Sequence, residues 1–303
     1  MNSYKILILF FFSSIYGTFG YGQSKKLESE LKSFIQDKKA IVAVAIQEGS
    51  KGDVIRVHAD EKLPMQSVFK FHIAVAMLTE IDKGNYKLQQ PIMIAKEDLT
   101  PDIWSPLREA YPQGTTMPLS TIITYMVSQS DNVACDIILK LLGGPKVVDR
   151  FFKGKGVKNL SIKINEKTMQ RNWEAQFQNW TTAAECTDLL KTYFYNDKKE
   201  LSAESHQFLW NVMKGTETGL KRLKGNLPAN TAVAHKTGYS GTKDGITEAV
   251  HDIGVIFLPN NDPIFISVLI SKSKENLAIN EEIIARIAHM TYDFYTQQPE
   301  RSK

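Results

Sequence analysis

Ser67 and Lys70 are the first residues whose types and spacing could support covalent chemistry. They lie three positions apart, which places a hydroxyl and an amine on the same face of a helix. Such a serine can attack a carbonyl carbon if burial and neighbouring positive charge lower the pKa of the lysine enough for it to accept the proton. The same spacing begins at Ser29, Ser240 and Ser271, but only Ser67 opens an apolar helical pattern. This context selects Ser67 as the candidate nucleophile.

Two further polar triplets follow along the chain. Ser-Asp-Asn, residues 130–132, lies between helical segments, where a loop can present short side chains inward. Helix capping is the alternative, because these residue types are preferred N-caps. Lys-Thr-Gly, residues 236–238, ends an apolar strand pattern, and its alternative is an ordinary strand end that runs into a turn. The three motifs in this order and context are hard to obtain by accident.

Together the three motifs resemble the signature of penicillin-recognising serine acyl transferases. Glu166, in an irregular loop, resembles the general base of the class A serine β-lactamases. Wider stretches at residues 64–70, 81–84, 104–106, 178–180 and 235–238 are similar to the VEB/PER branch of that class. The resemblance covers essentially all of the chain after residue 22. It implies a periplasmic enzyme that hydrolyses penicillins and cephalosporins, with broadened activity toward oxyimino-cephalosporins.

The resemblance also implies roles for the residues that match the acyl-transfer motifs. Ser67 resembles the acylated nucleophile and Lys70 its neighbouring base. Ser130 would relay a proton to the leaving lactam nitrogen, and Asn132 would hydrogen-bond the side-chain amide of the substrate. The backbone N–H groups of Ser67 and Tyr239 would form the oxyanion hole, where loss of one donor typically costs about 10²–10³ in rate.

Other residues are expected to bind the substrate. By the same resemblance, Lys236 and Thr237, in one motif with Gly238, would hold its carboxylate together with Arg222. The planar fork of an arginine matches a carboxylate, but a solvated surface charge is the alternative for Arg222. Trp104 could form an aromatic wall at the mouth of the site, or simply pack against its neighbours.

Glu166 separates a hydrolase from a transferase, because an acyl-serine ester is attacked slowly unless a carboxylate activates a water molecule. The alternative is a surface glutamate. Gln170, a candidate substrate-binding residue, stands where class A enzymes have an asparagine, or a histidine in the VEB/PER branch. Asn179 replaces the usual loop-locking aspartate, as in that branch. Tyr239 places a bulky ring where a small residue is more usual, which could reshape the pocket.

The hydrophobic pattern predicts the elements that must position these residues. A helix over residues 25–38 precedes a hairpin with strands at 40–47 and 53–58. From residue 67 to about 214 the pattern is helical, with segments at 69–83, 119–127, 133–142, 145–152, 182–195 and 202–213. The polar stretch at 161–180 shows little periodicity and is long enough for a functional loop.

Strand patterns return at residues 231–237, 253–258 and 264–271, and an amphipathic helix over 274–294 closes the chain. Strands at both ends with helices between them predict an α+β fold, in which terminal helices flank an antiparallel sheet beside an all-helical lobe. We expect residues 23–62 and 215–303 to form the α/β lobe and residues 63–214 the helical lobe. A cleft between two such lobes is the default place for a site.

The composition excludes several classes of protein. The 303 residues carry a net charge of +4 without a long block of like charges, so nucleic acid is not an expected partner. Six scattered histidines lack zinc-ligand spacing, and no phosphate-binding glycine motif occurs, so neither a metal nor another cofactor is expected. Residues 1–22 resemble a cleaved signal peptide, because the apolar run at 6–15 is short for a membrane span of about 20 residues, and a retained membrane anchor is the alternative.

Export would allow a disulfide between Cys135 and Cys186. Cys135 lies in an apolar helical run, which favours two free thiols. The leading hypothesis is a secreted, monomeric class A β-lactamase, with a β-lactam and a hydrolytic water as its only partners and no stable membrane association after processing. A D,D-transpeptidase or carboxypeptidase shares the three motifs, but Glu166 and the absence of a membrane or accessory domain argue against it. A penicillin sensor would acylate and remain acylated, and would normally need a signalling domain.

Overall fold

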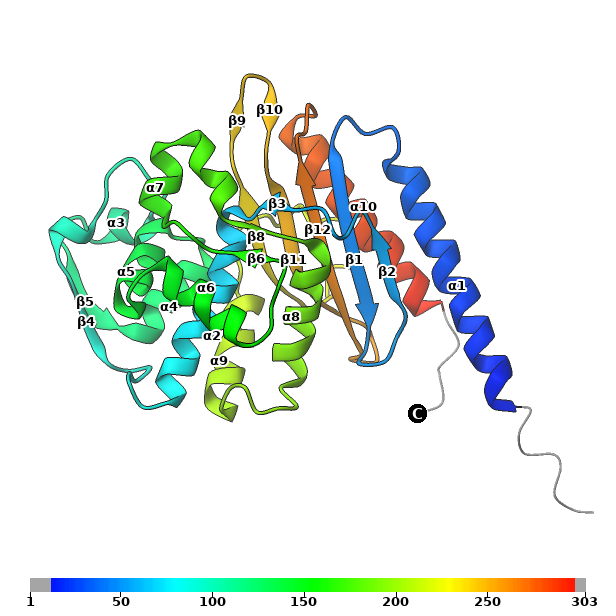
Figure 1. Ribbon diagram of the computed structural model, residues 1–303, viewed down its shortest axis with the longest axis horizontal. Helices are drawn as coiled ribbons and strands as arrows, with labels where there is room; N and C mark the ends of the chain where they lie inside the picture. Colours follow the sequence, from blue (N-terminus) through cyan, green and yellow to red (C-terminus); the bar gives the residue numbers. More distant parts are fainter. Residues whose placement is uncertain (1–11, 298–303) are drawn as a thin grey trace, which may run out of the picture.

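A five-stranded antiparallel sheet joins strands from both ends of the chain (Figure 1). The computed structural model describes residues 12–297, so residues 1–11 of the predicted signal peptide lie outside the described residues. The sheet has the order β2-β1-β12-β11-β8. Its strands are β1 (Ile41–Glu48), β2 (Val54–Val57), β8 (Val233–Tyr239), β11 (Val250–Phe257) and β12 (Pro263–Ser271). In its register, Val44 of β1 lies between Val57 and Val268.

Helices cover both faces of this sheet. Helices α1 (Phe12–Ile35) and α10 (Leu277–Thr296) lie on one face, and α8 (Ala183–Tyr195) lies on the other (Figure 1). Along β1, Val44 and Ile46 belong to the core beneath α1 and α10, whereas Ala43 and Ala45 belong to the core shared with the helical half. Because both faces are buried, β1 reads as an unbroken apolar run instead of an alternating one.

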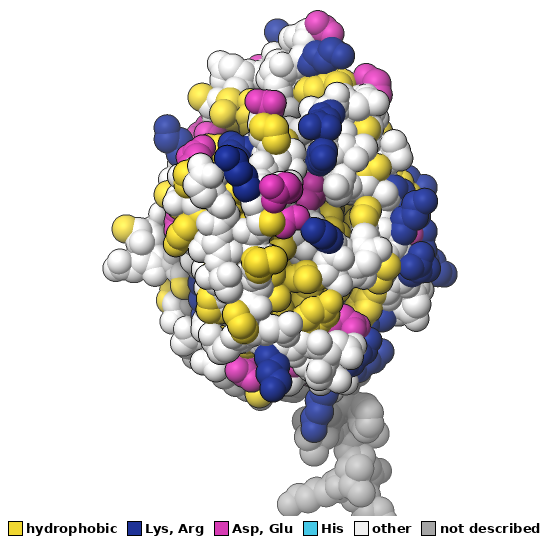
Figure 2. Space-filling view, turned by 90° about the vertical axis from the view of Figure 1, so that its left-hand side faces the viewer, with side chains coloured by type: hydrophobic (Ala, Val, Ile, Leu, Met, Phe, Trp, Pro, Cys, Tyr) yellow, Lys and Arg dark blue, Asp and Glu magenta, His cyan; other side chains and the backbone are white. Residues whose placement is uncertain are grey.

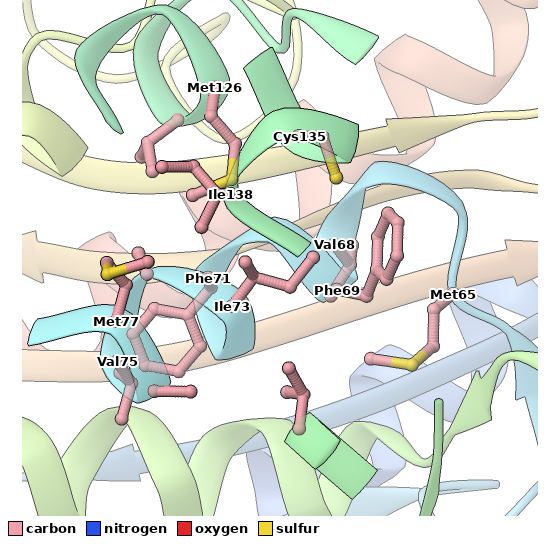
Figure 3. Close-up of a cluster of buried hydrophobic side chains, with 14 of the residues drawn as sticks. Met65, Val68, Phe69, Phe71, Ile73, Val75, Met77, Met126, Cys135 and Ile138 are labelled. Carbon is pink, nitrogen blue, oxygen red and sulfur yellow. The ribbon is translucent and has the colours of Figure 1, made fainter. Parts of the chain in front are cut away.

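Helix α2 (Phe69–Asp82) runs through the centre of the helical half, and its first ten residues are all buried. A helix that is apolar on every side must be surrounded by other elements. Figure 3 shows its side chains packed among residues such as Met126 and Ile138. The surrounding helices are α4 (Leu119–Ser128), α5 (Asn132–Leu142), α6 (Pro145–Gly154) and α9 (Ala203–Lys214).

Several short elements were not expected from the sequence. The strands β3 (Leu63–Pro64), β7 (Trp180–Thr181) and β6 (Leu160–Ser161) form a small sheet beside the 3-10 turn η1 (Gln66–Val68). The polar stretch at 161–180 contains helix α7 (Glu166–Arg171) and the 3-10 helix η3 (Trp173–Gln178). Two hairpins complete the list: β4 (Pro91–Ile94) with β5 (Thr115–Pro118), which enclose η2 (Lys96–Asp98) and α3 (Pro106–Ala110), and β9 (Thr242–Lys243) with β10 (Ile246–Thr247).

The structure confirms the predicted α+β class, and the long predicted segments from residue 40 onward correspond to observed helices or strands within a few residues. The helix predicted over residues 25–38 differs, because α1 begins at Phe12, within the predicted signal peptide, and ends at Ile35. The lobe boundaries at 62/63 and 214/215 stay a prediction. The face in Figure 2 carries basic, acidic and hydrophobic side chains interspersed. Within residues 12–297, no helix is both long and apolar enough to cross a membrane. Cys135 and Cys186 are buried free thiols.

Candidate active site

The Ser67 hydroxyl and the Lys70 amine are in direct contact. Ser67 lies in η1 and Lys70 in the first turn of α2, so the predicted three-residue spacing brings them to one face. Lys70 Nζ donates to Ser67 Oγ at 2.8 Å. Ser67 is partly exposed, whereas the Lys70 side chain is wholly buried. A substrate can therefore reach the hydroxyl while the amine stays shielded from water.

Four oxygen acceptors surround the amine of Lys70. Besides Ser67 Oγ, they are Ser130 O at 2.8 Å, Asn132 Oδ1 at 2.5 Å and Glu166 Oε1 at 2.8 Å. Glu166 is as completely buried as Lys70, so each side chain supplies the charge that the other needs in a dry environment. An ammonium has three protons and cannot donate to all four oxygens at once. The Ser67 hydroxyl also donates to Glu166 Oε1, at 3.4 Å.

Lys236 reaches the same cluster from strand β8. Its Nζ donates to Ser130 Oγ at 2.9 Å and to Thr237 O at 3.0 Å. Burial, together with the nearby charge of Lys70, lowers the pKa of Lys236 well below its usual range. Ser130 adopts a positive φ of 57° and so turns its hydroxyl toward one lysine and its carbonyl toward the other.

Asp131 fixes the loop between α4 and α5 and so positions its two neighbours, Ser130 and Asn132. Its carboxylate caps α5 by accepting from Ala134 N at 2.8 Å, and it also accepts from Ser105 Oγ and Leu107 N. Capping is therefore the role of the middle residue of the triplet. The residues on either side of it face the buried lysines, so both interpretations of Ser-Asp-Asn are correct for different positions.

Asp136 holds the backbone of Glu166 and was not identified from the sequence. Its carboxylate accepts from Glu166 N at 2.8 Å, from Lys167 N at 3.0 Å and from Asn165 Nδ2 at 3.1 Å. Asn165 in turn caps α7 through Thr168 N. Burial raises the pKa of Asp136 to about 6. The only signal in the sequence is an acidic residue in an apolar helix, one turn after Asn132.

Asn179 closes the other end of this loop. Its Oδ1 accepts from Lys163 N at 2.7 Å and Ile164 N at 3.1 Å, and its Nδ2 donates to Ile164 O at 2.9 Å. Its own carbonyl accepts from Met65 N, two residues before Ser67. Gln170 Nε2 lies 3.5 Å from Glu166 Oε2, at the limit of a hydrogen bond. The loop therefore has fixed ends and a weaker contact at Gln170.

Arg222 is buried, so the alternative of a solvated surface charge is wrong. Its Nη1 donates to Gly238 O at 3.1 Å and His251 O at 3.0 Å, and its Nε pairs with Glu281 Oε1 at 3.3 Å. These bonds place the guanidinium at the end of β8, beside the motif of Lys236. Thr237 Oγ1 is 2.6 Å from Thr218 Oγ1, on the turn that leads to Arg222.

Gly238 and two exposed rings complete the set of predicted residues. A Cβ on Gly238 would lie 2.8 Å from Met65 O, so only glycine allows β8 to approach the turn that carries Ser67. Tyr239 is 43% exposed, with its ring 6.0 Å from the Arg222 guanidinium. Trp104 is 58% exposed and its carbonyl accepts from Asn132 N.

Among residues 12–297, no group of three or more His, Cys, Asp or Glu side chains is placed to hold a metal ion. The cluster is instead a partly exposed hydroxyl beside a buried amine and carboxylate, with a second buried lysine. It can deliver a nucleophilic oxygen to a carbonyl carbon, move its proton and hold an anionic group nearby.

Comparison with known proteins gives a consistent result. The model of the beta-lactamase enzyme family matches residues 26–295. The chain is 44% identical over 290 residues to beta-lactamase VEB-1 of Pseudomonas aeruginosa, covering 96% of each chain. It is 39% identical over 274 residues to the extended-spectrum beta-lactamase PER-1 of the same organism, covering 90% of this chain and 88% of the relative. The crystal structure of the TLA-1 extended-spectrum beta-lactamase superposes with a TM-score of 0.88 at 42% identity, covering 91% of this chain and 100% of that one.

Proposed function

Because this chain belongs to the class A branch of the beta-lactamase enzyme family, we propose that it hydrolyses penicillins and cephalosporins through an acyl-serine intermediate. We extend the proposal to extended-spectrum cephalosporins, since PER-1 and TLA-1 carry that description. One observation carries the mechanism: the Glu166 carboxylate lies within reach of both Ser67 Oγ and Lys70 Nζ.

Acylation would begin when Ser67 Oγ attacks the lactam carbonyl carbon and Lys70, having passed a proton to the Glu166 carboxylate 2.8 Å away, takes the hydroxyl proton. The backbone N–H groups of Ser67 and Tyr239 would stabilise the oxyanion. As the carbon–nitrogen bond breaks, Ser130 would donate its proton to the lactam nitrogen, and Lys70 would restore it. Glu166 would then return its proton to Lys70 and become a carboxylate again. The contact of Lys70 with Ser67 at 2.8 Å supports the first transfer.

Deacylation would use Glu166 as a general base. A water molecule would lose a proton to the carboxylate while its oxygen attacks the ester carbonyl carbon. The Ser67 oxygen would then leave and recover the proton. Gln170 lies beside Glu166 and would contact the water or the substrate.

The substrate carboxylate would bind Lys236 and Thr237, with Arg222 beside them. Asn132 would hydrogen-bond the side-chain amide of the substrate. Trp104 and Tyr239 would flank the mouth of the site, which their exposure supports. We also propose that the enzyme is a periplasmic monomer after loss of residues 1–22, in which case the exported protein begins at Gln23.

The test is the hydrolysis of a chromogenic cephalosporin by the purified protein, followed through many equivalents. We expect sustained turnover. A burst of about one equivalent that then stops would indicate a transpeptidase relative or a penicillin sensor.

The role of Glu166 has its own variant in the same assay. Glu166→Ala should keep the burst, lose turnover and accumulate an acyl-enzyme that mass spectrometry detects. Without its ion-pair partner, the buried Lys70 amine can lose its extra proton to water and still take that of Ser67, whereas the attack of water on the ester has no other base. Glu174→Ala changes an exposed glutamate of the same loop and should behave as wild type. Undiminished turnover of Glu166→Ala would remove Glu166 from the base role.

A further inference from the structure

Two buried glutamines connect the turn of the nucleophile to the loop of the base. Gln66 Nε2 donates to Gln176 Oε1 at 2.7 Å, and the two residues are only 4% and 1% exposed. Gln176 Nε2 donates in turn to Trp173 O at 2.8 Å, so both ends of its amide are engaged. Neither side chain forms a hydrogen bond with Ser67 or Glu166 in the described part of the chain, and neither has a part in the mechanism above.

Gln66 has a backbone conformation that needs support from its surroundings. Its φ is +43°, in the left-handed region that residues other than glycine rarely adopt, and it directly precedes Ser67. Strand β8 supports the turn on one side, since a Cβ on Gly238 would lie 3.4 Å from Gln66 Cβ. On the other side, the side chain of Gln66 bonds to the loop. The position of Ser67 therefore depends on both neighbours.

Gln176 lies in η3, which follows the helix α7 of Glu166 and packs against it. Its carbonyl also accepts from Asn179 N at 3.2 Å, which links it to the closed end of the loop. Asp136 holds Glu166 from helix α5, by its backbone N–H. The Gln66–Gln176 bond thus adds a side-chain attachment of this loop to the backbone bond between Met65 N and Asn179 O, and it runs directly to the residue before Ser67.

We infer that Gln66 and Gln176 are positioning residues that fix the distance between the nucleophile and the base, so that deacylation depends on their hydrogen bond more than acylation does. Acylation uses Ser67 and Lys70, which share the continuous segment of η1 and α2. Deacylation needs a water molecule held between Ser67 and Glu166, which lie on two separate segments. This inference rests on the hydrolase function proposed above.

The test separates the two chemical steps in Gln176→Met, a side chain of similar length that cannot form the bond. We expect the deacylation rate constant to fall by about 10- to 100-fold, as for a small misplacement of a catalytic group, and the acylation rate constant to change less than about threefold. Stopped-flow kinetics and mass spectrometry of the acyl-enzyme measure the two steps. Gln178→Met is the matched control, because it makes the same change at an exposed position of η3 and should leave both steps unchanged.

Gln66→Met breaks the same bond from the other side and should give the same pattern if Gln176→Met does not fold. In the double variant the losses should not add, because the first substitution already removes the shared bond. Equal losses in both steps, additive losses, or wild-type kinetics in the variants would overturn the inference. A wild-type protein that stops after one equivalent would instead reject the proposed function, and the inference with it.

Discussion

Asp136 is a partly buried carboxyl group whose protonation should make the stability of the fold depend on pH. Burial raises its pKa from an ordinary 3.8 to about 6 in the folded protein. Between these two values the folded state binds more protons than the unfolded state. The contribution of Asp136 to stability is therefore complete below pH 3.8 and is lost as the pH rises through 6.

The size of the effect follows from the same two values. The pKa difference between 3.8 and about 6 corresponds to about 3 kcal/mol of unfolding free energy. About 2 kcal/mol of this contribution is lost as the pH rises from 4 to 7. Asp136→Asn removes this titration and keeps an oxygen that can accept from Glu166 N. The stability of the wild type relative to the variant should thus decline by about 2 kcal/mol from pH 4 to pH 7.

Urea denaturation of both proteins at unit pH steps measures this difference. Burial lowers the pKa of His72 and of His251 to about 4, so each histidine costs stability as the pH falls from 6.5 toward 4. Both histidines are present in wild type and variant, and their effect cancels in the comparison. Asp37→Asn, at an exposed carboxylate, is the control and should follow the wild type. Parallel curves for wild type and Asp136→Asn would refute the reasoning.

Two further predictions concern buried polar side chains. Asn179→Ala removes three hydrogen bonds to backbone atoms of residues 163 and 164 and should lower the unfolding free energy by about 2–4 kcal/mol, as measured by chemical denaturation. A loss below about 0.5 kcal/mol would show that water replaces the amide. Lys236→Met should reduce kcat/KM for β-lactams by about 10²-fold yet raise the unfolding free energy by about 1 kcal/mol, because a buried cation is replaced by an apolar chain. A destabilised Lys236→Met variant would contradict this.

The sequence predicted the parts of the structure that local patterns determine. A helix fixes the geometry of Ser67 and Lys70, since a spacing of three residues brings two side chains to one face whatever surrounds them. The long apolar segments of α2 and β12 can likewise be predicted from the local sequence pattern. The short strands β3, β6 and β7 are not, because two residues have no periodicity. They exist through pairing across the chain, such as Leu63 with Thr181.

The supporting residues of the site were harder to predict for the same reason. Glu166 was identified through its family resemblance, but the carboxylate that holds its backbone, Asp136, lies 30 positions earlier in the chain. Gln66 and Gln176 are separated by 110 positions. The residues that neighbour a glutamine in the sequence do not indicate a partner so many positions away. A polar residue within a segment that must be buried is the single signal the sequence offers, and it does not name the partner.

The two buried lysines show why this site is built at a cost to the fold. Lys70 has the Glu166 carboxylate at 2.8 Å, whereas Lys236 donates to a hydroxyl and a carbonyl. Among the described residues no carboxylate lies within ion-pair distance of Lys236, and burial together with the charge of Lys70 lowers its pKa. A bound carboxylate would supply the missing charge and favour the ammonium form. In the proposed function, an anionic substrate would gain binding energy from the lysine that lacks an acidic partner, which is why the variant that stabilises the fold should also be the one that loses activity.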